Sequence, residues 1–75
     1  MTSEFDLHGV KDHDVYIKVE NFVLLNKTPM NIITGRSEKM IELTTDVLKK
    51  HRFQYYIRCH NAGMITIIKG EINAY

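Results

Sequence analysis

Hydrophobic and polar residues alternate near the start of the chain, and further along the apolar residues adopt a helical spacing. Residues 4–7 alternate between polar and apolar side chains, which predicts a short strand, and His8-Gly9 predicts a turn after it. Between about residues 12 and 26, apolar side chains recur at steps of three and four, which predicts an amphipathic helix. The predicted core face of this helix consists of Val15, Val19, Phe22 and Val23.

The ends of this first helix carry recognisable signals. Asp12 is the expected N-cap, and Asp14 adds negative charge to the first turn, where it complements the helix dipole. Lys27-Thr28-Pro29 ends the helix, because a residue before proline avoids the helical conformation.

The second half of the chain repeats the two patterns. Residues 30–34 predict a second strand, which Gly35 breaks, and Ser37 is the expected cap of a second helix. The predicted core face of that helix consists of Met40, Thr44, Val47, Leu48 and His51. Basic residues complement the dipole in its last turn, namely Lys49, Lys50 and Arg52.

Strand-forming residues at 55–59 and 64–68 are separated by a tight turn at 61–63, which predicts an antiparallel hairpin. The element order is therefore β-α-β-α-β-β, and the first β-α-β unit has the usual length for a right-handed crossover between parallel strands. We expect an α/β fold of the α+β two-layer type, in which two helices cover one face of a four-stranded mixed sheet.

The length of 75 residues suits one small domain, which we place at residues 1–75, with a core at about 4–69 and a tail at 70–75. Such a domain favours a shallow surface site over a deep cavity. The sequence has no run of apolar residues long enough to span a membrane and no secretory signal at its start, and its single cysteine, Cys59, cannot form an internal disulfide. We therefore expect a cytoplasmic protein without a membrane partner.

The formal net charge of +1 is low for a protein that binds nucleic acid, because contacts with phosphates supply most non-specific affinity. Basic groups would have to be concentrated locally, and they partly are: Lys49, Lys50, His51 and Arg52 are consecutive, and Arg58, His60 and Lys69 follow.

Two turns are candidates for chemistry, and they should meet because the ends of parallel strands lie at one edge of a sheet. In the first turn, Asp6 and His8 share the face opposite the helices, and a carboxylate beside an imidazole suits general acid–base catalysis. The alternative is that both residues satisfy backbone groups at the end of the strand.

In the second turn, Thr34, Gly35, Arg36 and Ser37 precede a helix whose free N–H groups favour an anion. Glycine permits close approach, and the guanidinium of Arg36 is a two-pronged phosphate donor. The alternative is a simple helix cap with a solvated arginine. A nucleophilic role for Ser37 is disfavoured, because the second glycine of the G-x-S-x-G elbow is absent.

Tyr56, Arg58 and His60 alternate along the third strand, so they either line a base-stacking and phosphate-binding face or form ordinary surface or a dimer contact. The chain has no H-E-x-x-H spacing, so a structural zinc site is not indicated.

The residues of both turns resemble the Smr (small MutS-related) domain family. The resemblance rests on Asp6-Leu7-His8-Gly9, on Asp14-Val15, on Ile32-Ile33-Thr34-Gly35, and on Asn61 and Gly63 followed by Ile67, so it covers nearly the whole chain. It implies a fold like the C-terminal domain of a bacterial translation initiation factor, and DNA nicking or RNA cleavage.

In the family, D-x-H-G and T-G-x-G motifs are linked to activity and nucleic-acid binding, which implies roles for Asp6, His8 and Gly9 and for Thr34, Gly35 and Arg36. Position 37 departs from the family pattern, because Ser37 replaces a glycine. Serine resists a positive φ, so binding can survive while the loop geometry needed for catalysis changes.

Three functions remain open: an endonuclease that hydrolyses phosphodiester bonds, a non-catalytic DNA- or RNA-binding module, and a protein-interaction domain that docks a partner or forms a homodimer. In the first, Asp6 and His8 are catalytic, and Asp6 would either orient His8 or hold a divalent ion, Mg²⁺ or Mn²⁺. Contacts with nucleic acid or its phosphates are assigned to Gly9, Thr34, Gly35, Arg36, Ser37, Lys39, Lys50, Arg58 and His60.

Overall fold

A computed structural model describes residues 3–58 and 63–70, and it contains six elements in the order expected from the sequence. They are β1 (Ser3–Asp6), α1 (Asp12–Leu25), β2 (Met30–Ile33), α2 (Glu38–Lys50), β3 (Phe53–Arg58) and β4 (Met64–Gly70).

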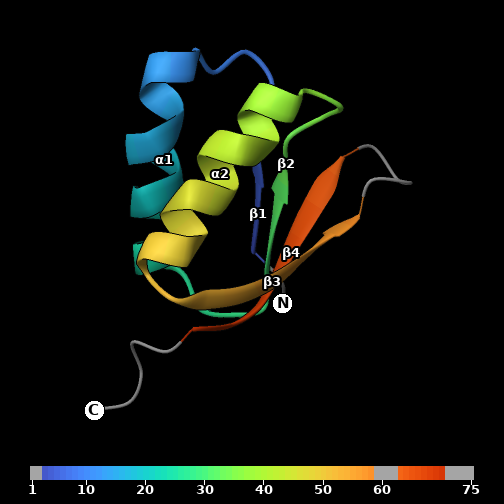
Figure 1. Cartoon of the computed structure of the whole chain (residues 1–75). Coiled ribbons are helices and arrows are strands. Elements are labelled where there is room, and N and C mark those ends of the chain that lie inside the picture. Colours follow the sequence, from blue (N-terminus) through green and yellow to red (C-terminus); the bar gives the residue numbers. More distant parts are fainter. Residues whose placement is uncertain (1–2, 59–62, 71–75) are drawn as a thin grey trace.

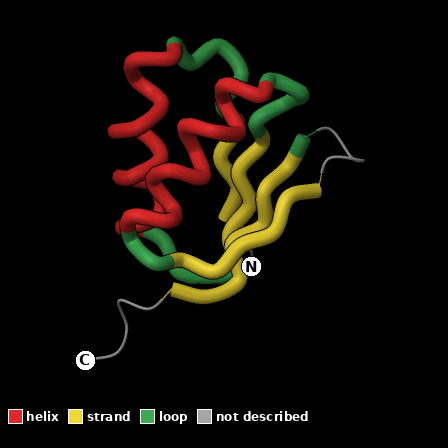
Figure 2. Tube along the Cα trace, viewed as in Figure 1, coloured by secondary structure: helices red, strands yellow, loops and turns green. Residues whose placement is uncertain are grey.

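The strands form one four-stranded sheet in the order β1-β2-β4-β3. β1 and β2 are parallel, whereas β4 pairs antiparallel with both β2 and β3. Both helices cover the same face of the sheet, as Figures 1 and 2 show. The expected α+β two-layer fold with a mixed sheet is confirmed.

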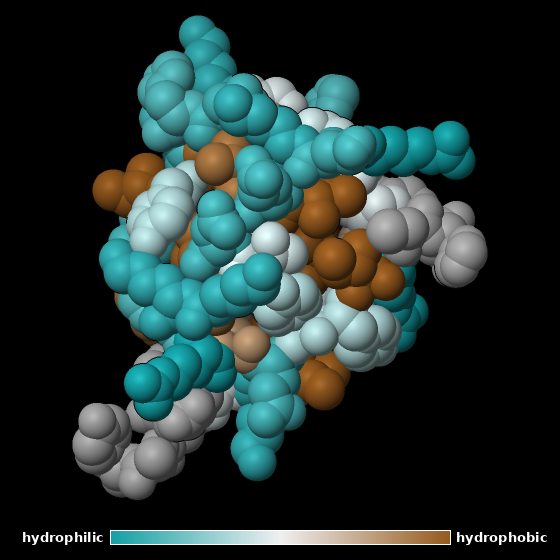
Figure 3. All heavy atoms as spheres, in the orientation of Figure 1, coloured by the Kyte–Doolittle hydropathy of each residue, from teal (hydrophilic) through white to brown (hydrophobic). Residues whose placement is uncertain are grey.

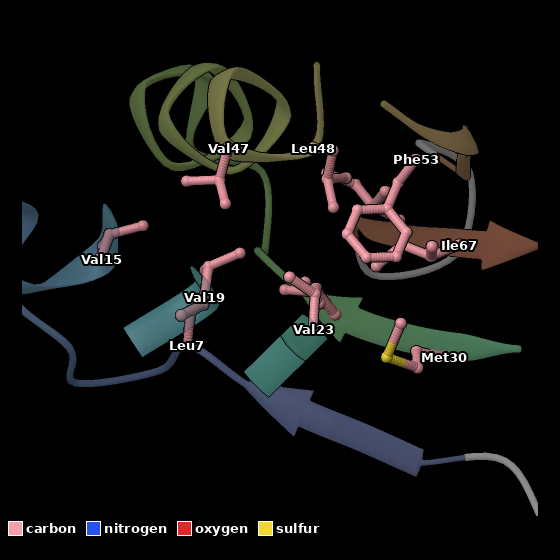
Figure 4. Packing of buried hydrophobic residues seen from close by; sticks show 11 residues of the cluster. Leu7, Val15, Val19, Val23, Met30, Val47, Leu48, Phe53 and Ile67 are labelled. Atoms are coloured by element: carbon pink, nitrogen blue, oxygen red, sulfur yellow. The ribbon is translucent and has the colours of Figure 1, made fainter. Parts of the chain in front are cut away.

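The core lies between the two layers, where the spacing of apolar residues places them. Valines of α1 and the Val47-Leu48 pair of α2 face the inward side chains of β2 and β4, and all of these are at most 1% exposed. Figure 4 shows these side chains converging from both helices and from the sheet. Phe22 of α1 is only half-buried, and its ring lies 5.3 Å from that of Phe5, so Phe5 faces the helices.

The hairpin strands are longer than predicted. β3 begins at Phe53 rather than at residue 55, and β4 extends to Gly70. The reason is a contact between the two ends, because Phe53 is only 7% exposed and pairs with Gly70. A Cβ at Gly70 would lie 2.6 Å from the Phe53 ring, so only glycine leaves room for the ring.

The two helices begin differently. Asp12 is the first residue of α1 and not its N-cap, which is Lys11 and makes no side-chain cap hydrogen bond, so that prediction was wrong. Ser37 caps α2 as predicted, since the backbone N–H of Met40 donates to its Oγ at 3.3 Å. In the described part of the chain, neither helix has the length and apolar character needed to cross a bilayer.

Candidate functional site

The turns that follow β1 and β2 lie at the same edge of the sheet, as the parallel pairing predicts (Figure 1). The backbone N–H of Leu7 donates to the carbonyl of Ile33 at 2.9 Å, which continues the pairing one residue beyond β1. We call this edge, formed by residues 6–10 and 34–37, the loop edge.

Gly9 shapes the first turn of the loop edge. The backbone N–H of Val10 donates to the carbonyl of Leu7 at 2.9 Å, and Gly9, the third residue of this turn, has a φ of +83°. A type II β-turn requires a positive φ at that position. A Cβ added at Gly9 would meet nothing within 4 Å, so the backbone conformation, and not crowding, calls for glycine. His8 is therefore presented at the tip of a tight turn.

Asp6 holds this turn through the backbone. Its Oδ1 accepts a hydrogen bond of 2.8 Å from the backbone N–H of His8, and both side chains are exposed. The His8 ring makes no hydrogen bond with the Asp6 carboxylate. At the end of this strand Asp6 thus satisfies a backbone group, the alternative that the sequence left open, and it positions His8 without polarising its ring.

The second turn is anchored by the carbonyl of Gly63. This oxygen accepts from the backbone N–H of Thr34 at 2.7 Å, from the Thr34 hydroxyl at 2.6 Å and from the backbone N–H of Gly35 at 3.1 Å. Two of the loop amides expected to be free for an anion are therefore engaged within the protein. Gly35 and Gly63 both have positive φ, and a Cβ at Gly63 would overlap the carbonyl group of Gly35.

The start of α2 retains the donors that remain available. The N–H groups in the first turn of a helix have no partner within the helix, and Arg36 and Lys39 beside them are exposed. Glu38 places a carboxylate in the same turn, which weakens the positive potential there. The donors are present, but the local charge is mixed.

Two hollows flank Gly35. One, of about 300 Å³, is lined by Asp6, His8, Ile33, Thr34 and Gly35. The other, of about 280 Å³, is lined by Gly35, Arg36, Glu38, Ile41 and Gly63. Figure 3 shows hydrophobic atoms gathered beside the helical layer on the side of the sheet, while hydrophilic side chains cover most of this view. The first hollow brings together four of the residues singled out from the sequence.

Lys50 lies far from this site. Lys50 ends α2, whose first residue Glu38 directly follows the loop edge, so Lys50 and Glu38 are about 18 Å apart along the helix axis at 1.5 Å per residue. Its Nζ lies 3.7 Å from Glu20 Oε2 and 5.3 Å from the centre of the Tyr16 ring. The interaction with Tyr16 is the larger cause that raises the pKa of Lys50 above its ordinary 10.5, and the negative charge of Glu20 is the next. Lys50 therefore stabilises the contact between the helices and is not brought to the loop edge.

Arg58 lies on the sheet face that points away from the helices, next to Tyr56. Its Nη2 donates to the Tyr56 hydroxyl at 2.6 Å, and its guanidinium carbon is 5.1 Å from the ring centre. This hydrogen bond holds the pKa of Tyr56 below its ordinary 10.0. His60, the third residue of the alternation, lies outside the described residues.

A metal ion would find few ligands here. The described residues contain no group of three or more His, Cys, Asp or Glu side chains that could hold one. Asp6 is the carboxylate that lines the first hollow. Mg²⁺ is commonly bound by one or two carboxylates together with substrate phosphates, so Asp6 fits an ion that arrives with a substrate.

Gly63 is the site residue that sequence reasoning did not select. It belongs to the final motif of the resemblance, yet its role is structural: its carbonyl group fixes the Thr34-Gly35 turn.

Comparisons with protein-family models, with curated proteins and with solved structures find no match to this chain.

Proposed function

We propose that this chain is a cytoplasmic nucleic-acid-binding domain of the Smr type, with endonuclease activity at the loop edge. One observation carries the proposal: the exposed Asp6 and His8 share a hollow with the Thr34-Gly35 turn, at the carboxyl ends of two parallel strands. Open α/β sheets bind their ligands at such edges. The lack of an internal disulfide partner for Cys59 supports the cytoplasmic location.

Hydrolysis of a phosphodiester requires two proton transfers. Water attacks phosphorus and loses a proton, the bond from phosphorus to the leaving oxygen breaks, and that oxygen gains a proton. The His8 imidazole is the group at the hollow that can accept or donate one of these protons. Asp6 holds the turn that presents it, through the hydrogen bond with the backbone of His8.

Negative charge that develops on phosphate oxygens needs nearby donors. The exposed Arg36 guanidinium and the unused N–H groups at the start of α2 supply them, on the other side of Gly35 from His8. A divalent ion held by Asp6 and by the phosphate would neutralise further charge.

The test is to incubate the purified domain with supercoiled plasmid and with labelled single-stranded RNA, in magnesium, manganese or chelator. His8→Ala should lower product formation by about 100-fold or more. His13→Ala is the matched control, because His13 is exposed at the start of α1 and does not line the hollow; it should cut normally. Equal cutting by wild type and His8→Ala would reject this mechanism.

A binding module without catalysis is the second candidate. It is favoured by the lack of a hydrogen bond between the Asp6 carboxylate and the His8 ring, and by Ser37, whose hydroxyl caps α2 where the family pattern has glycine. It predicts a gel shift that weakens steeply with salt, with no product under any metal condition.

A further inference from the structure

The sheet face opposite the helices is uncovered by any helix in the part of the chain that the structure describes, and its side chains form two rows across four strands. Residues paired in register share a face. The row nearest the loop edge is Asp6, Ile33, Met64 and Arg58, and the next row is Glu4, Asn31, Thr66 and Tyr56.

The two ends of these rows carry opposite charge. β3 and β4 contain Arg58 and Lys69, both exposed, and no carboxylate, whereas β1 contributes Glu4 and Asp6. A polyanion is therefore attracted to the hairpin half of the face. The acidic half is the one that carries the proposed catalytic residues.

Tyr56 and Arg58 form a planar surface on the basic half of this face, which we call the platform. Tyr56 is 43% exposed, and Arg58 is fixed beside it by the hydrogen bond to the phenol and by contact with the ring. In the same row, the Thr66 hydroxyl donates to Oδ1 of Asn31 at 2.9 Å, so a hydrogen bond also fixes the side chains next to Tyr56. Aromatic rings and guanidinium planes of this kind stack with unpaired bases.

We propose that a single-stranded segment of nucleic acid crosses this open sheet face, with a base stacked on the Tyr56–Arg58 pair and a phosphodiester reaching Asp6 and His8. Arg58 and Asp6 are three strand spacings apart, about 14 Å. That distance suits a short oligonucleotide, since sheet surfaces that bind single strands cover at least about four nucleotides. The proposal rests on the proposed function, to which it adds the substrate class and its path.

Single strands fit this face better than a duplex does. In a duplex the faces of the bases are already stacked on one another, so the Tyr56–Arg58 platform would have no base to receive. The helix start at residues 36–39 would in contrast contact phosphates of either form.

The experiment uses His8→Ala as the background, so that the substrate is not cut. Eight-nucleotide single-stranded RNA, single-stranded DNA of the same sequence and a short DNA duplex are titrated, and backbone amide shifts are followed by NMR. We expect the largest shifts in β3, β4 and residues 6–8. Binding of RNA or of DNA alone supports the proposal and identifies the source; tighter binding of the duplex overturns it.

Variants in the same background locate the platform. Tyr56→Leu should weaken binding of the single strand about tenfold or more, whereas Tyr56→Phe, which keeps the ring, should bind nearly normally. Arg58→Ala should weaken binding and lower the salt slope by about one unit, whereas Lys18→Ala on α1 should do neither. A dispersed amide spectrum identifies the variants that are folded, and Arg58→Ala tests the platform if Tyr56→Leu does not fold.

The outcomes separate this proposal from the proposed function. If the oligonucleotides bind but shifts are confined to residues 34–39, and Tyr56→Leu binds as its parent does, the path across the sheet is wrong and the loop-edge function survives. If no nucleic acid binds in any form, both fail.

Discussion

Where α2 ends, the Glu20 carboxylate of α1 accepts a hydrogen bond of 2.8 Å from His51 Nε2 and lies 3.7 Å from the Lys50 ammonium. At the loop edge, a carboxylate, an imidazole and a cation are also present, in Asp6, His8 and Arg36. There the Asp6 carboxylate accepts a hydrogen bond from a backbone N–H, and His8 is exposed.

We call the first group, Tyr16, Glu20, Lys50 and His51, the interhelical cluster. Its charged side chains satisfy one another, and the Glu20 and His51 side chains are only 25% and 20% exposed. At the loop edge, Asp6, Thr34 and Ser37 instead hydrogen-bond with backbone groups. Among the described residues, the carboxylate, the imidazole and the guanidinium of this edge form no ion pair with one another. The same residue types therefore stabilise the fold in one place and remain available for a ligand in the other. Pairing, and not residue type, separates the two roles.

The sharpest way to break this comparison is to exchange which histidine is removed. His8→Ala should lower cleavage by about 100-fold or more, because a general acid–base group contributes that much, while leaving the free energy of unfolding nearly unchanged. His51→Ala should lower the free energy of unfolding, because Glu20 loses its partner, and should cut normally when assayed well below its melting temperature. Plasmid nicking and urea unfolding of both variants measure the two effects; a stability loss in His8→Ala equal to that of His51→Ala would contradict the division.

The scaffold of the loop edge gives the next largest effect. Gly63→Ala places a Cβ against the Gly35 carbonyl group and strains a positive φ, so we expect a loss of about 3 kcal/mol in the free energy of unfolding. Gly9→Ala is the matched control, because it has a positive φ but open space around its Cβ, and it should cost about 1 kcal/mol. Equal losses in urea unfolding would show that crowding against Gly35 contributes nothing.

Asp6 allows a finer test of how the loop edge is built. Asp6→Ala removes the acceptor for the His8 backbone N–H and should lower cleavage about tenfold or more, because the turn is no longer fixed. Asp6→Asn keeps an oxygen acceptor without the charge, so it should stay within about threefold of wild type if positioning is the role. The alternative is that the carboxylate acts through a metal ion. In that case Asp6→Asn should be as defective as Asp6→Ala, and Mn²⁺ added after chelation should restore cleavage by the wild type but not by either variant.

The sequence predicts the frame of the molecule better than the chemistry of its loops. Spacings of two and of three to four residues give the six elements, and the parallel pairing of the first two strands predicts that His8 and Gly35 meet. These patterns are local, or they follow from a general rule of topology. The cap of α1 was misjudged because the turn of residues 7–10 delivers Lys11, and not Asp12, to the start of the helix.

Contacts between distant backbone groups leave no such pattern. The Gly63 carbonyl, 29 residues from Thr34, accepts hydrogen bonds from the Thr34-Gly35 turn. The sequence gives no sign of this contact, so it does not show that these amides are unavailable to an anion. The pairing of Phe53 with Gly70 lengthens the hairpin for the same kind of reason. Likewise, nothing in the spacing of Asp6 and His8 tells whether the carboxylate contacts the ring or the backbone.

The smallest expected effect is the pH dependence of the interhelical cluster. The hydrogen bond with His51, and then the charge of Lys50, hold the pKa of Glu20 below its ordinary 4.5 in the folded protein. A lowered folded pKa means that the carboxylate stabilises the fold above about pH 4.5, and that this contribution is lost as the pH falls through the folded pKa.

Urea unfolding at pH 6 and at pH 3 measures this contribution. Glu20→Gln should be less stable than wild type at pH 6, and the difference should shrink at pH 3, because the contribution of the charge is lost as the pH falls through the lowered folded pKa. Glu42→Gln, on the exposed side of α2, is the matched control and should follow wild type at both pH values. A difference between wild type and Glu20→Gln that is the same at pH 3 and at pH 6 would show that the Glu20 charge does not join the helices, and the contrast between the cluster and the loop edge would then rest on packing alone.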